Sequence, residues 1–580
     1  MPNRTLGWVQ DATDIVKLKT LISVFVPNST INLDLRNNLI PNLLDASCDK
    51  AAMINQLTAD PVKVKYDLLK GRGTIRGTTR RTAPVTGIAQ AVLPGQTPGR
   101  YQSDWAANSF IVWAIAIGLL EYNDTTDYCS ITERGLDFAT STGQASLDVL
   151  KNALLSYPPV SRILRLLNDD PQNCLTKFEI GSHFGFIGEK GFTCFSQRFI
   201  LEGLQSIGTN TIGRNQLLRN TEGTSDKYVR TICSWLVSVG WVTQQMKQVT
   251  ENINGVAYTD SLRAYKLTLL GRQDLNRSSG GSRHAQIVKN VDYFMLATKA
   301  ADSDYLRKRR LALIDYLSHG YHTLDECAAR LRRNGIAETT QVVRDDIRGI
   351  ENIGLSITHR RSDDSYCITD AINILHAPAV PVVSNKSNTT LIKDNLRQVL
   401  RSIDHRYLTL IDYGFDTPSG SNRNYELLTA DLLTAELNFA GARLGDTRKP
   451  DVCVFYGNKG LIIDNKAYAN GYNIPISQAD EMIRYIEENQ RRELTLNPNH
   501  WWDVFLPTVT DFNFSFVSGA FVGNYRSNIQ HIKNRTQVDG AAIDSANLLL
   551  LADAIKSGDI SYYEALDKFR INDLISIQVP

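Results

Sequence analysis

The sequence lacks the features that mark three special classes of protein. Its eight cysteines contain no C-x-x-C pair and its nine histidines do not cluster with them, which argues against a structural zinc site. Scattered cysteines are typical of reduced thiols in a cytoplasmic protein. The longest apolar run, residues 110–120, is much shorter than the roughly 20 residues of a membrane helix, and the polar residues 1–5 do not have the pattern of a signal peptide. We therefore expect a cytoplasmic protein without a membrane-spanning segment.

An excess of one charge is missing as well. The chain has 63 lysines and arginines against 61 aspartates and glutamates, a net charge of +2. A surface that binds a polyanion must therefore be local, because no global basic signal exists. The 580 residues exceed the roughly 250–300 residues at which single cores stop growing. We expect several soluble domains.

Three segments share one pattern, in which a helix, a glycine and a strand are followed by a polar turn, a return strand and a short helix opened by threonine. The helices are expected at residues 109–116, 227–239 and 341–352, and the return segments at 128–136 (strand and short helix), 264–271 and 365–370. A helix followed by a β-hairpin wing is the winged-helix form of the helix-turn-helix. We predict three such modules and favour DNA binding by at least one of them, although many winged helices bind proteins.

Local basic clusters support DNA binding. Arg72, Arg76, Arg80 and Arg81 lie in a loop rich in glycine and threonine, which can present guanidinium groups to phosphates or base edges. A second run, residues 307–310, opens a helix of the third module. Such a run is usually a solvated face, and it could also contact the DNA backbone or another domain.

A linker and a change of pattern follow the three modules. Residues 376–388 contain prolines and then serine and asparagine, a composition that does not build a core element. Beyond the linker, helices are expected at 391–403, 424–438 and 477–488, with a strand at 512–517. The predicted fold class is therefore multidomain α+β, with winged-helix modules followed by an α/β domain.

Two apolar strands of this last domain are joined by a tight turn. The turn is expected at Asn458-Lys459, between two glycines. If these glycines pair, the register places Asp451 opposite Lys466 and Cys453 opposite Asp464. Because side chains alternate along a strand, the two carboxylates and the lysine share one face.

This group of side chains suits metal-dependent hydrolysis. Carboxylate oxygens bind Mg²⁺, and a lysine close to them can orient or deprotonate a water. The spacing P-D-x12-D-x-K, from Pro450 to Lys466, is similar to the signature of PD-(D/E)XK nucleases. The alternative is a surface hairpin with an ordinary ion pair, since the motif alone is loose.

Over nearly its full length the sequence resembles the FokI family of type IIS restriction endonucleases. The matching motifs in the carboxy-terminal part are residues 448–451, 464–468, 471–482, 485–490, 497–502, 517–519 and 523–525. The matching motifs in the amino-terminal part are residues 7–10, 155–159, 222–223 and 225–228.

The resemblance implies a recognition region, a linker and a Mg²⁺-dependent cleavage domain that cuts outside the recognised site. The implied bounds are 1–145, 146–285 and 286–375 for three recognition subdomains, 376–388 for the linker and 389–580 for the PD-(D/E)XK cleavage domain. By motif match, Asp451 and Asp464 hold the metal and Lys466 is the third catalytic residue. Asp480 and Arg484 lie on the helix implied for transient homodimerisation.

The resemblance also implies DNA-contacting residues. In the first subdomain these are Gln10, Asp11, Trp105 and one or more of Arg76, Arg80 and Arg81. Asp11 stands where the family has asparagine, which removes a hydrogen-bond donor. In the second subdomain they are Asn220, Glu222 and Lys227. A carboxylate accepts from cytosine N4 and a lysine donates to guanine, so a site such as GGATG or a close relative is a hypothesis.

The sequence thus predicts an enzyme that binds a short asymmetric site in double-stranded DNA and hydrolyses phosphodiester bonds a fixed distance away with Mg²⁺, leaving 5′-phosphates. Two alternatives remain open. One is a strand-specific nickase of the same family. The other is a winged-helix DNA-binding regulator with an inactive nuclease-like domain.

Overall fold

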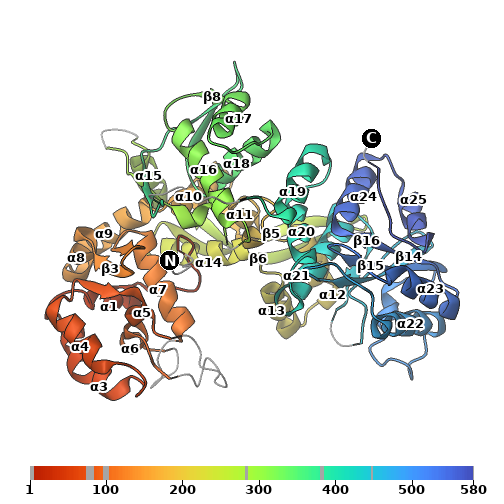
Figure 1. Ribbon diagram of the computed structural model, residues 1–580, viewed down its shortest axis with the longest axis horizontal. Helices are drawn as coiled ribbons and strands as arrows, with labels where there is room; N and C mark the ends of the chain where they lie inside the picture. Colours follow the sequence, from red (N-terminus) through yellow and green to blue (C-terminus); the bar gives the residue numbers. More distant parts are fainter. Residues whose placement is uncertain are drawn as a thin grey trace. The chain divides into compact units, whose positions relative to one another are not determined.

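The structure is a computed structural model and describes residues 6–72, 84–95, 103–280, 285–298, 300–378, 385–445 and 448–578. Two compact units can be distinguished (Figure 1). The first comprises Met1–Phe186, Ser225–Lys247 and Leu262–Ser384, and the second comprises Ile187–Thr224, Gln248–Ser261 and Asn385–Pro580. Within the described ranges, no helix is both long and apolar enough to cross a membrane.

The three predicted modules are present, and each has a three-stranded antiparallel sheet. The first contains α1 (Ile15–Ser23), α2 (Thr30–Asp34), η1 (Leu35–Leu39), α3 (Ile40–Leu43), α4 (Lys50–Ala59), β1 (Lys63–Lys65), α5 (Tyr66–Lys70), α6 (Ile88–Val92), α7 (Asp104–Ala116), β2 (Leu120–Asn123), β3 (Tyr128–Ile131) and α8 (Glu133–Thr140). The sheet order is β1-β3-β2, so the hairpin wing gains a third strand from earlier in the chain.

The second module repeats this arrangement with a longer wing, and its sheet order is β4-β6-β5. Its elements are α9 (Gly143–Leu155), α10 (Pro158–Asp169), β4 (Cys174–Thr176), α11 (Lys177–Gly181), η2 (Lys190–Phe192), α12 (Gln197–Ile207), α13 (Thr211–Asn220), α14 (Thr224–Ser238), β5 (Val242–Ile253), β6 (Val256–Leu267) and α15 (Leu269–Ser278).

The third module has the sheet order β8-β10-β9, and β11 pairs with β7 in a separate parallel pair. Its elements are β7 (Lys289–Asp292), η3 (Tyr293–Leu296), α16 (Ser303–Leu317), β8 (His322–Thr323), α17 (Leu324–Arg333), α18 (Thr340–Asn352), β9 (Ile357–Arg360), β10 (Ser365–Ile368) and β11 (Ile372–Leu375).

The helix expected after the third wing is absent from the described chain, which corrects the sequence-based pattern. In the first two modules, Thr132 and Thr268 cap α8 and α15, and a glycine follows three residues later. A Cβ on Gly135 would lie 2.1 Å from the backbone carbonyl oxygen of Leu119, the residue just before β2, so only glycine fits this close approach. The third module has Ile372 at the corresponding position, and the chain continues into β11.

The carboxy-terminal domain is a mixed five-stranded sheet of order β12-β13-β14-β15-β16. Its strands are β12 (Ala440–Arg443), β13 (Val452–Tyr456), β14 (Lys459–Lys466), β15 (Asp511–Ser518) and β16 (Gly540–Asp544). β12, β13 and β14 pair antiparallel, while β14, β15 and β16 run parallel. The expected strand at 512–517 is confirmed by β15.

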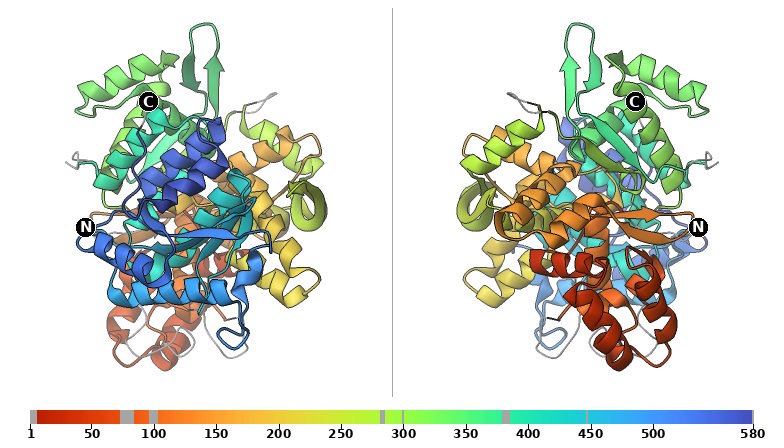
Figure 2. Two further views of the ribbon diagram at one scale, coloured as in Figure 1. Left: turned by 90° about the vertical axis from the view of Figure 1, so that its right-hand side faces the viewer. Right: turned by 90° about the vertical axis from the view of Figure 1, so that its left-hand side faces the viewer.

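Helices cover both faces of this sheet (Figure 2). They are α19 (Asn388–Val399), η4 (His405–Leu408), α20 (Thr409–Gly414), α21 (Pro418–Asp431), η5 (Leu432–Glu436), α22 (Ile476–Arg491), η6 (Trp501–Val504), α23 (Tyr525–Thr536), α24 (Ser545–Ser557), α25 (Tyr562–Asp567) and η7 (Lys568–Arg570).

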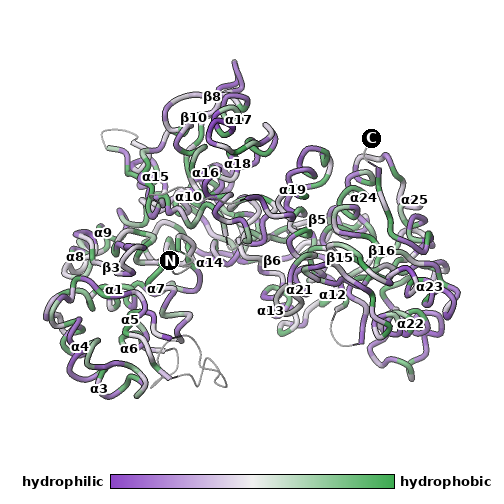
Figure 3. Tube along the Cα trace, viewed as in Figure 1, coloured by the Kyte–Doolittle hydropathy of each residue, from purple (hydrophilic) through white to green (hydrophobic). Residues whose placement is uncertain are grey.

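Alternate residues of the central strands enter two different cores, and Figure 3 colours the chain of this domain by hydropathy. Val452 and Ile463 belong to the core that includes residues of α20, α21 and α24. Cys453 and Ile462 belong to the core on the other face, with residues of α22 and α23. By alternation, Asp451, Asp464 and Lys466 lie on the face covered by α22 and α23.

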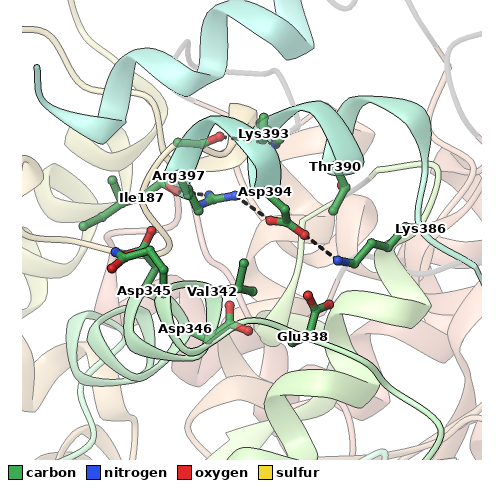
Figure 4. Close-up of polar contacts among 12 residues, drawn as sticks. Ile187, Glu338, Val342, Asp345, Asp346, Lys386, Thr390, Lys393, Asp394 and Arg397 are labelled. Carbon is green, nitrogen blue, oxygen red and sulfur yellow. Dashed lines mark hydrogen bonds and ion pairs between the residues drawn. The ribbon is translucent and has the colours of Figure 1, made fainter. Parts of the chain in front are cut away.

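Part of the second module belongs to the same compact unit as the carboxy-terminal domain. The Thr193 and Tyr413 hydroxyls are 2.7 Å apart, and Ser196 N–H donates to the buried Asp431 carboxylate over 3.0 Å. Figure 4 shows Arg397, which donates to Asp394 and to the carbonyl of Ile187 over 3.0 Å each. These contacts join segments that are remote in the sequence.

Candidate active site and DNA-recognition residues

The hairpin that carries the catalytic motif has a register different from the one expected. Tyr456 pairs with Lys459 and Val452 with Ile463, so the turn is Gly457-Asn458 rather than Asn458-Lys459. Gly457 has a φ of +59°, a conformation that a two-residue hairpin turn needs at its first central position.

The corrected register shifts the pairing by two residues, so the same side chains stay on the same face. Continuing the pairing by one position places Asp451 beside Asp464 instead of Lys466. The backbone N–H of Asn465 donates to Asp451 Oδ2 over 2.7 Å, and Lys466 Nζ lies 2.8 Å from Asp464 Oδ2. The structure therefore brings together the three residues of the motif.

Burial and neighbouring charges shift the pKa values of Asp451 and Lys466 in this cluster. Burial raises the pKa of Asp451 well above its ordinary value, and the charges of Asp464 and Glu426 raise it further. Burial lowers the pKa of Lys466, but attraction to Asp464 and Asp451 outweighs this effect, so its net pKa is raised. Lys466 is therefore an ammonium group at neutral pH, and it only partly offsets the negative charge.

Two helices contribute further polar groups that sequence reasoning missed. Glu426 of α21 accepts from Arg443 Nε and Nη2 over 3.1 and 2.7 Å. On α22, Glu481 Oε1 accepts from the Tyr485 hydroxyl over 3.0 Å, and the same hydroxyl donates to the carbonyl of Lys449. Glu426 stands in no motif, so the sequence carries no local signal for it, whereas Glu481 lies within the matching motif 471–482 but was given no role.

The donor set fits a hard divalent cation. Adjacent carboxylates such as Asp451 and Asp464 are the oxygen ligands that Mg²⁺ prefers, and the pKa of Asp451 is raised by burial and then by its negative neighbours. In the described part of the chain, no group of three or more histidine, cysteine, aspartate or glutamate side chains has the arrangement of a complete metal site. Asp451 and Asp464 would thus supply part of a coordination sphere.

The predicted dimerisation residues do not pair with each other. Arg484 contacts Glu481 over 3.1 Å and Glu488 over 3.7 Å on its own helix. The side chain of Asp480 is 65% exposed and lies 3.9 Å from His531 of α23. Asp480 is therefore not bound in an intrahelical ion pair with Arg484, and its carboxylate faces solvent.

Asp11 and Trp105 are brought together in the first unit. Trp105 Nε1 donates to Asp11 Oδ2 over 3.4 Å. Arg230 Nη2, from α14, lies 3.3 Å from Asp11 Oδ1, and sequence reasoning missed this arginine. Asp11 has a φ of +64°, and its N–H donates to Thr231 Oγ1 over 3.1 Å. The Gln10 side chain hydrogen-bonds to the Tyr228 hydroxyl.

The other predicted DNA contacts lie in or between helices of the second module. Lys227 lies on α14, three residues before Arg230, so the two share a helix face. Asn220 ends α13, and Glu222 follows in the short connection to α14. Arg76, Arg80 and Arg81 fall outside the described residues.

Three arginines of the basic run at 307–310 are buried in internal ion pairs and do not form the solvated face expected of such a run. Arg309 Nε and Arg310 Nε donate to the carboxylate of Asp346 over 2.6 and 2.9 Å, and Arg309 Nη1 donates to Glu338 over 2.9 Å. Arg307, Arg309 and Arg310 are all buried. The run thus stabilises the third module by internal ion pairs.

Four family models match consecutive parts of the chain. They are the FokI recognition-domain subdomain 1 at residues 4–141, subdomain 2 at 146–283, the FokI D3 domain at 296–362 and the FokI cleavage domain at 386–576. The chain is 33% identical to the type II restriction enzyme FokI of Planomicrobium okeanokoites, over 98% of this chain and 99% of that protein. The chain belongs to the FokI family.

A second relative and two solved structures agree with this assignment. The type II restriction enzyme StsI of Streptococcus sanguinis is 30% identical over 97% of this chain and 94% of that protein. The structure of FokI alone has a TM-score of 0.86 and that of FokI bound to DNA 0.89, each at 33% identity and covering 99% of this chain and all of the other. This chain is a type II restriction endonuclease, an enzyme class that generally uses divalent metal ions.

Proposed function

We propose that this FokI-family endonuclease is a type IIS enzyme. It binds a short asymmetric site in double-stranded DNA, GGATG or a close relative, and hydrolyses phosphodiester bonds a fixed distance away with Mg²⁺, leaving 5′-phosphates. The observation that carries the proposal is the cluster of Asp451, Asp464 and Lys466, which lies on the carboxy-terminal sheet and far in sequence from the three winged-helix sheets. Cleavage and recognition therefore belong to different parts of the chain.

The roles of the three residues follow from their charges. Asp451 and Asp464 hold Mg²⁺, which when bound stabilises phosphorane charge and activates a water. The two carboxylates raise the pKa of Lys466. A bound cation that neutralises their charge would therefore lower the pKa of Lys466 again. Lys466 is then placed to orient or deprotonate the attacking water, or to stabilise charge on the phosphate.

Recognition uses polar side chains of the first two modules. Lys227 and Arg230 can each donate to guanine O6 and N7, and Glu222 can accept from cytosine N4. Gln10, Asp11, Asn220, Trp105 and one or more of Arg76, Arg80 and Arg81 complete the set that we assign to DNA.

One active site cuts one strand, so double-strand cleavage requires transient pairing of two cleavage domains. The exposed carboxylate of Asp480 and the neighbouring Arg484 supply the pairing surface. A C2 interface presents the same patch on both partners, so the aspartate of one copy can meet the arginine of the other.

Run-off sequencing of cleaved DNA tests the proposal, because it reports the site and the cutting distance together. DNA cut only when Mg²⁺ is present, at one distance from one asymmetric sequence, is the expected result. Cuts within the recognised sequence, or cuts at unrelated positions, would contradict a type IIS mechanism.

A further inference from the structure

We propose that His376 is a positioning residue that anchors the end of the recognition region and thereby keeps the cutting distance uniform. This inference rests on the proposed type IIS cleavage. His376 directly follows β11, the last strand of the third module, and 377–387 connect it to α19 of the cleavage domain. It lies where the two activities of the chain are joined.

The imidazole is held from two sides. Nδ1 lies 3.1 Å from Asp292 Oδ2 at the end of β7, and Nε2 lies 3.0 Å from the carbonyl oxygen of Tyr122 on β2. The His376 side chain is only 8% exposed, and its ring packs near the rings of Tyr122 and Phe294. One side chain thus connects the first module to the third at the start of the linker.

The anchor matters because β11 has weak support of its own. Within the described ranges of the chain its only strand partner is β7, in a two-stranded parallel sheet, and an isolated strand pair is marginally stable. Each residue released from such a pair lengthens the chain's reach by at most about 3.3–3.6 Å, close to the roughly 3.4 Å rise of one base pair. Loss of the anchor should therefore add cutting positions about one base pair apart per released residue.

The two contacts also specify a protonation state. A carboxylate and a carbonyl can only accept, so both ring nitrogens must donate and the ring must be an imidazolium. Burial lowers the pKa of His376, while Asp292, the Tyr122 carbonyl and Asp124 raise it by more, so the net pKa is raised.

Other charged groups face the same cavity. Glu121, Glu133 and Arg134 line it together with His376.

The pKa of His376 is higher in the folded state than in the unfolded state, where it is 6.5. The protonated ring therefore contributes its full stabilisation to the folded state below pH 6.5, and this contribution is lost as pH rises through the folded-state pKa.

The test is run-off sequencing with the full chain and Mg²⁺ at two pH values, one below 6.5 and one well above the folded pKa. For the wild type we expect a narrow distribution of cut positions at low pH and a broader one at high pH. His376→Ala should give the broad distribution at both. His319→Ala is the matched control, because the imidazole of this exposed histidine hydrogen-bonds to the Asp315 carbonyl near the end of α16, away from the linker, and the variant should behave as the wild type.

A second variant keeps the test decisive if His376→Ala unfolds. His376→Gln preserves the side-chain volume and one hydrogen-bond donor but does not titrate. At low pH its distribution of cut positions should be wider than that of the wild type, and this distribution should not change with pH. A narrow distribution for His376→Ala or His376→Gln at both pH values would overturn the role of His376. Absence of a fixed cutting distance in the wild type would instead contradict the proposed type IIS function.

Discussion

Asp451 lies beside Asp464 across the β13–β14 pair, and the N–H of Asn465 holds the first of these carboxylates over 2.7 Å. The pair is therefore fixed by backbone geometry rather than by flexible side chains. Burial raises the pKa of Asp451, and the negative charge of Asp464 raises it further. The two nearby carboxylates therefore have an unfavourable electrostatic interaction, which a bound divalent cation would reduce.

Asp451→Asn should stabilise the protein at neutral pH in the absence of metal. Because the folded-state pKa of Asp451 is raised above 3.8, the folded state binds this proton more tightly than the unfolded state does, and stability falls as pH rises through that range. A tenfold difference in proton affinity between the two states corresponds to about 1.4 kcal/mol. Thermal unfolding should show a higher Tm for the variant at neutral pH and no gain below pH 3.8.

The same measurement with Mg²⁺ provides the control. Added Mg²⁺ should raise the Tm of the wild type and leave Asp451→Asn almost unchanged, because the variant has lost a ligand. Asp511→Asn is a matched variant at the opposite end of the same sheet, where Asp511 pairs with Arg570. Its Tm should still rise when Mg²⁺ is added. An equal response of wild type and Asp451→Asn would place the cation elsewhere.

Asp480→Arg should slow double-strand cleavage while nicking continues. The carboxylate is exposed and is not paired with Arg484, so reversal of its charge acts on the partner rather than on the fold. Plasmid cleavage followed over time should accumulate nicked circles. Asp503→Arg, at a carboxylate that is 73% exposed in the same domain, is the control. If Asp480→Arg linearises plasmid at the wild-type rate, α22 is not the pairing surface.

Arg230→Ala should reduce sequence discrimination by about 1–3 kcal/mol, the typical value of one good base contact. Competition binding with single-base variants of the site measures this loss position by position. Arg272→Ala removes an exposed arginine that contacts Asn173 and should leave discrimination intact. A uniform loss of affinity for all sequences would make Arg230 a phosphate contact instead.

Asp11→Asn should change the base preferred at one position. Asp11 can only accept, so it suits an amino group such as cytosine N4, whereas asparagine both donates and accepts and matches adenine N6 and N7. Selection of binding sites from a randomised pool would report the change. An identical selected sequence for both proteins would show that Asp11 serves only to orient Arg230 and Trp105.

Arg309→Ala should destabilise the protein by about 3–5 kcal/mol, the typical cost of removing one partner from a buried ion pair, although Arg310 and Tyr305 still contact the two carboxylates. Asp346 and Glu338 both accept from this arginine. The salt dependence of DNA binding should not change, whereas loss of a phosphate contact would reduce the slope by about 1. Denaturant unfolding and salt titrations separate the two roles.

Much of this architecture could be predicted from the sequence. The three helix-and-wing repeats and the α/β pattern of the last domain are confirmed, because both depend on local periodicity and on glycines at strand starts. The register of the catalytic hairpin could not be fixed, since Gly457-Asn458-Lys459-Gly460 allows two turns one residue apart, whose strand pairings differ by two residues. Because side chains alternate along a strand, a shift of two residues leaves Asp451, Asp464 and Lys466 on the same face in either register.

The predictions that failed depended on contacts between distant residues. The buried partners of Arg309 lie outside its own helix, so the local sequence indicated a solvent-exposed helix face instead of a buried ion pair. Arg230 and Glu426 stand in no motif and were found only from their places beside Asp11 and Asp451. The missing third-module helix is explained by Ile372, which has no room where the other modules have glycine.

Lys466→Ala should separate cleavage from binding, and both are measured on one DNA duplex that carries the recognised site. Loss of a group that contributes several kcal/mol to the transition state should reduce cleavage by at least about 10³-fold. Lys459→Ala, at the other end of β14, is the matched control and should cleave normally. Binding of the duplex should be unchanged in both variants. Wild-type cleavage by Lys466→Ala would contradict the assignment of the active site to this hairpin.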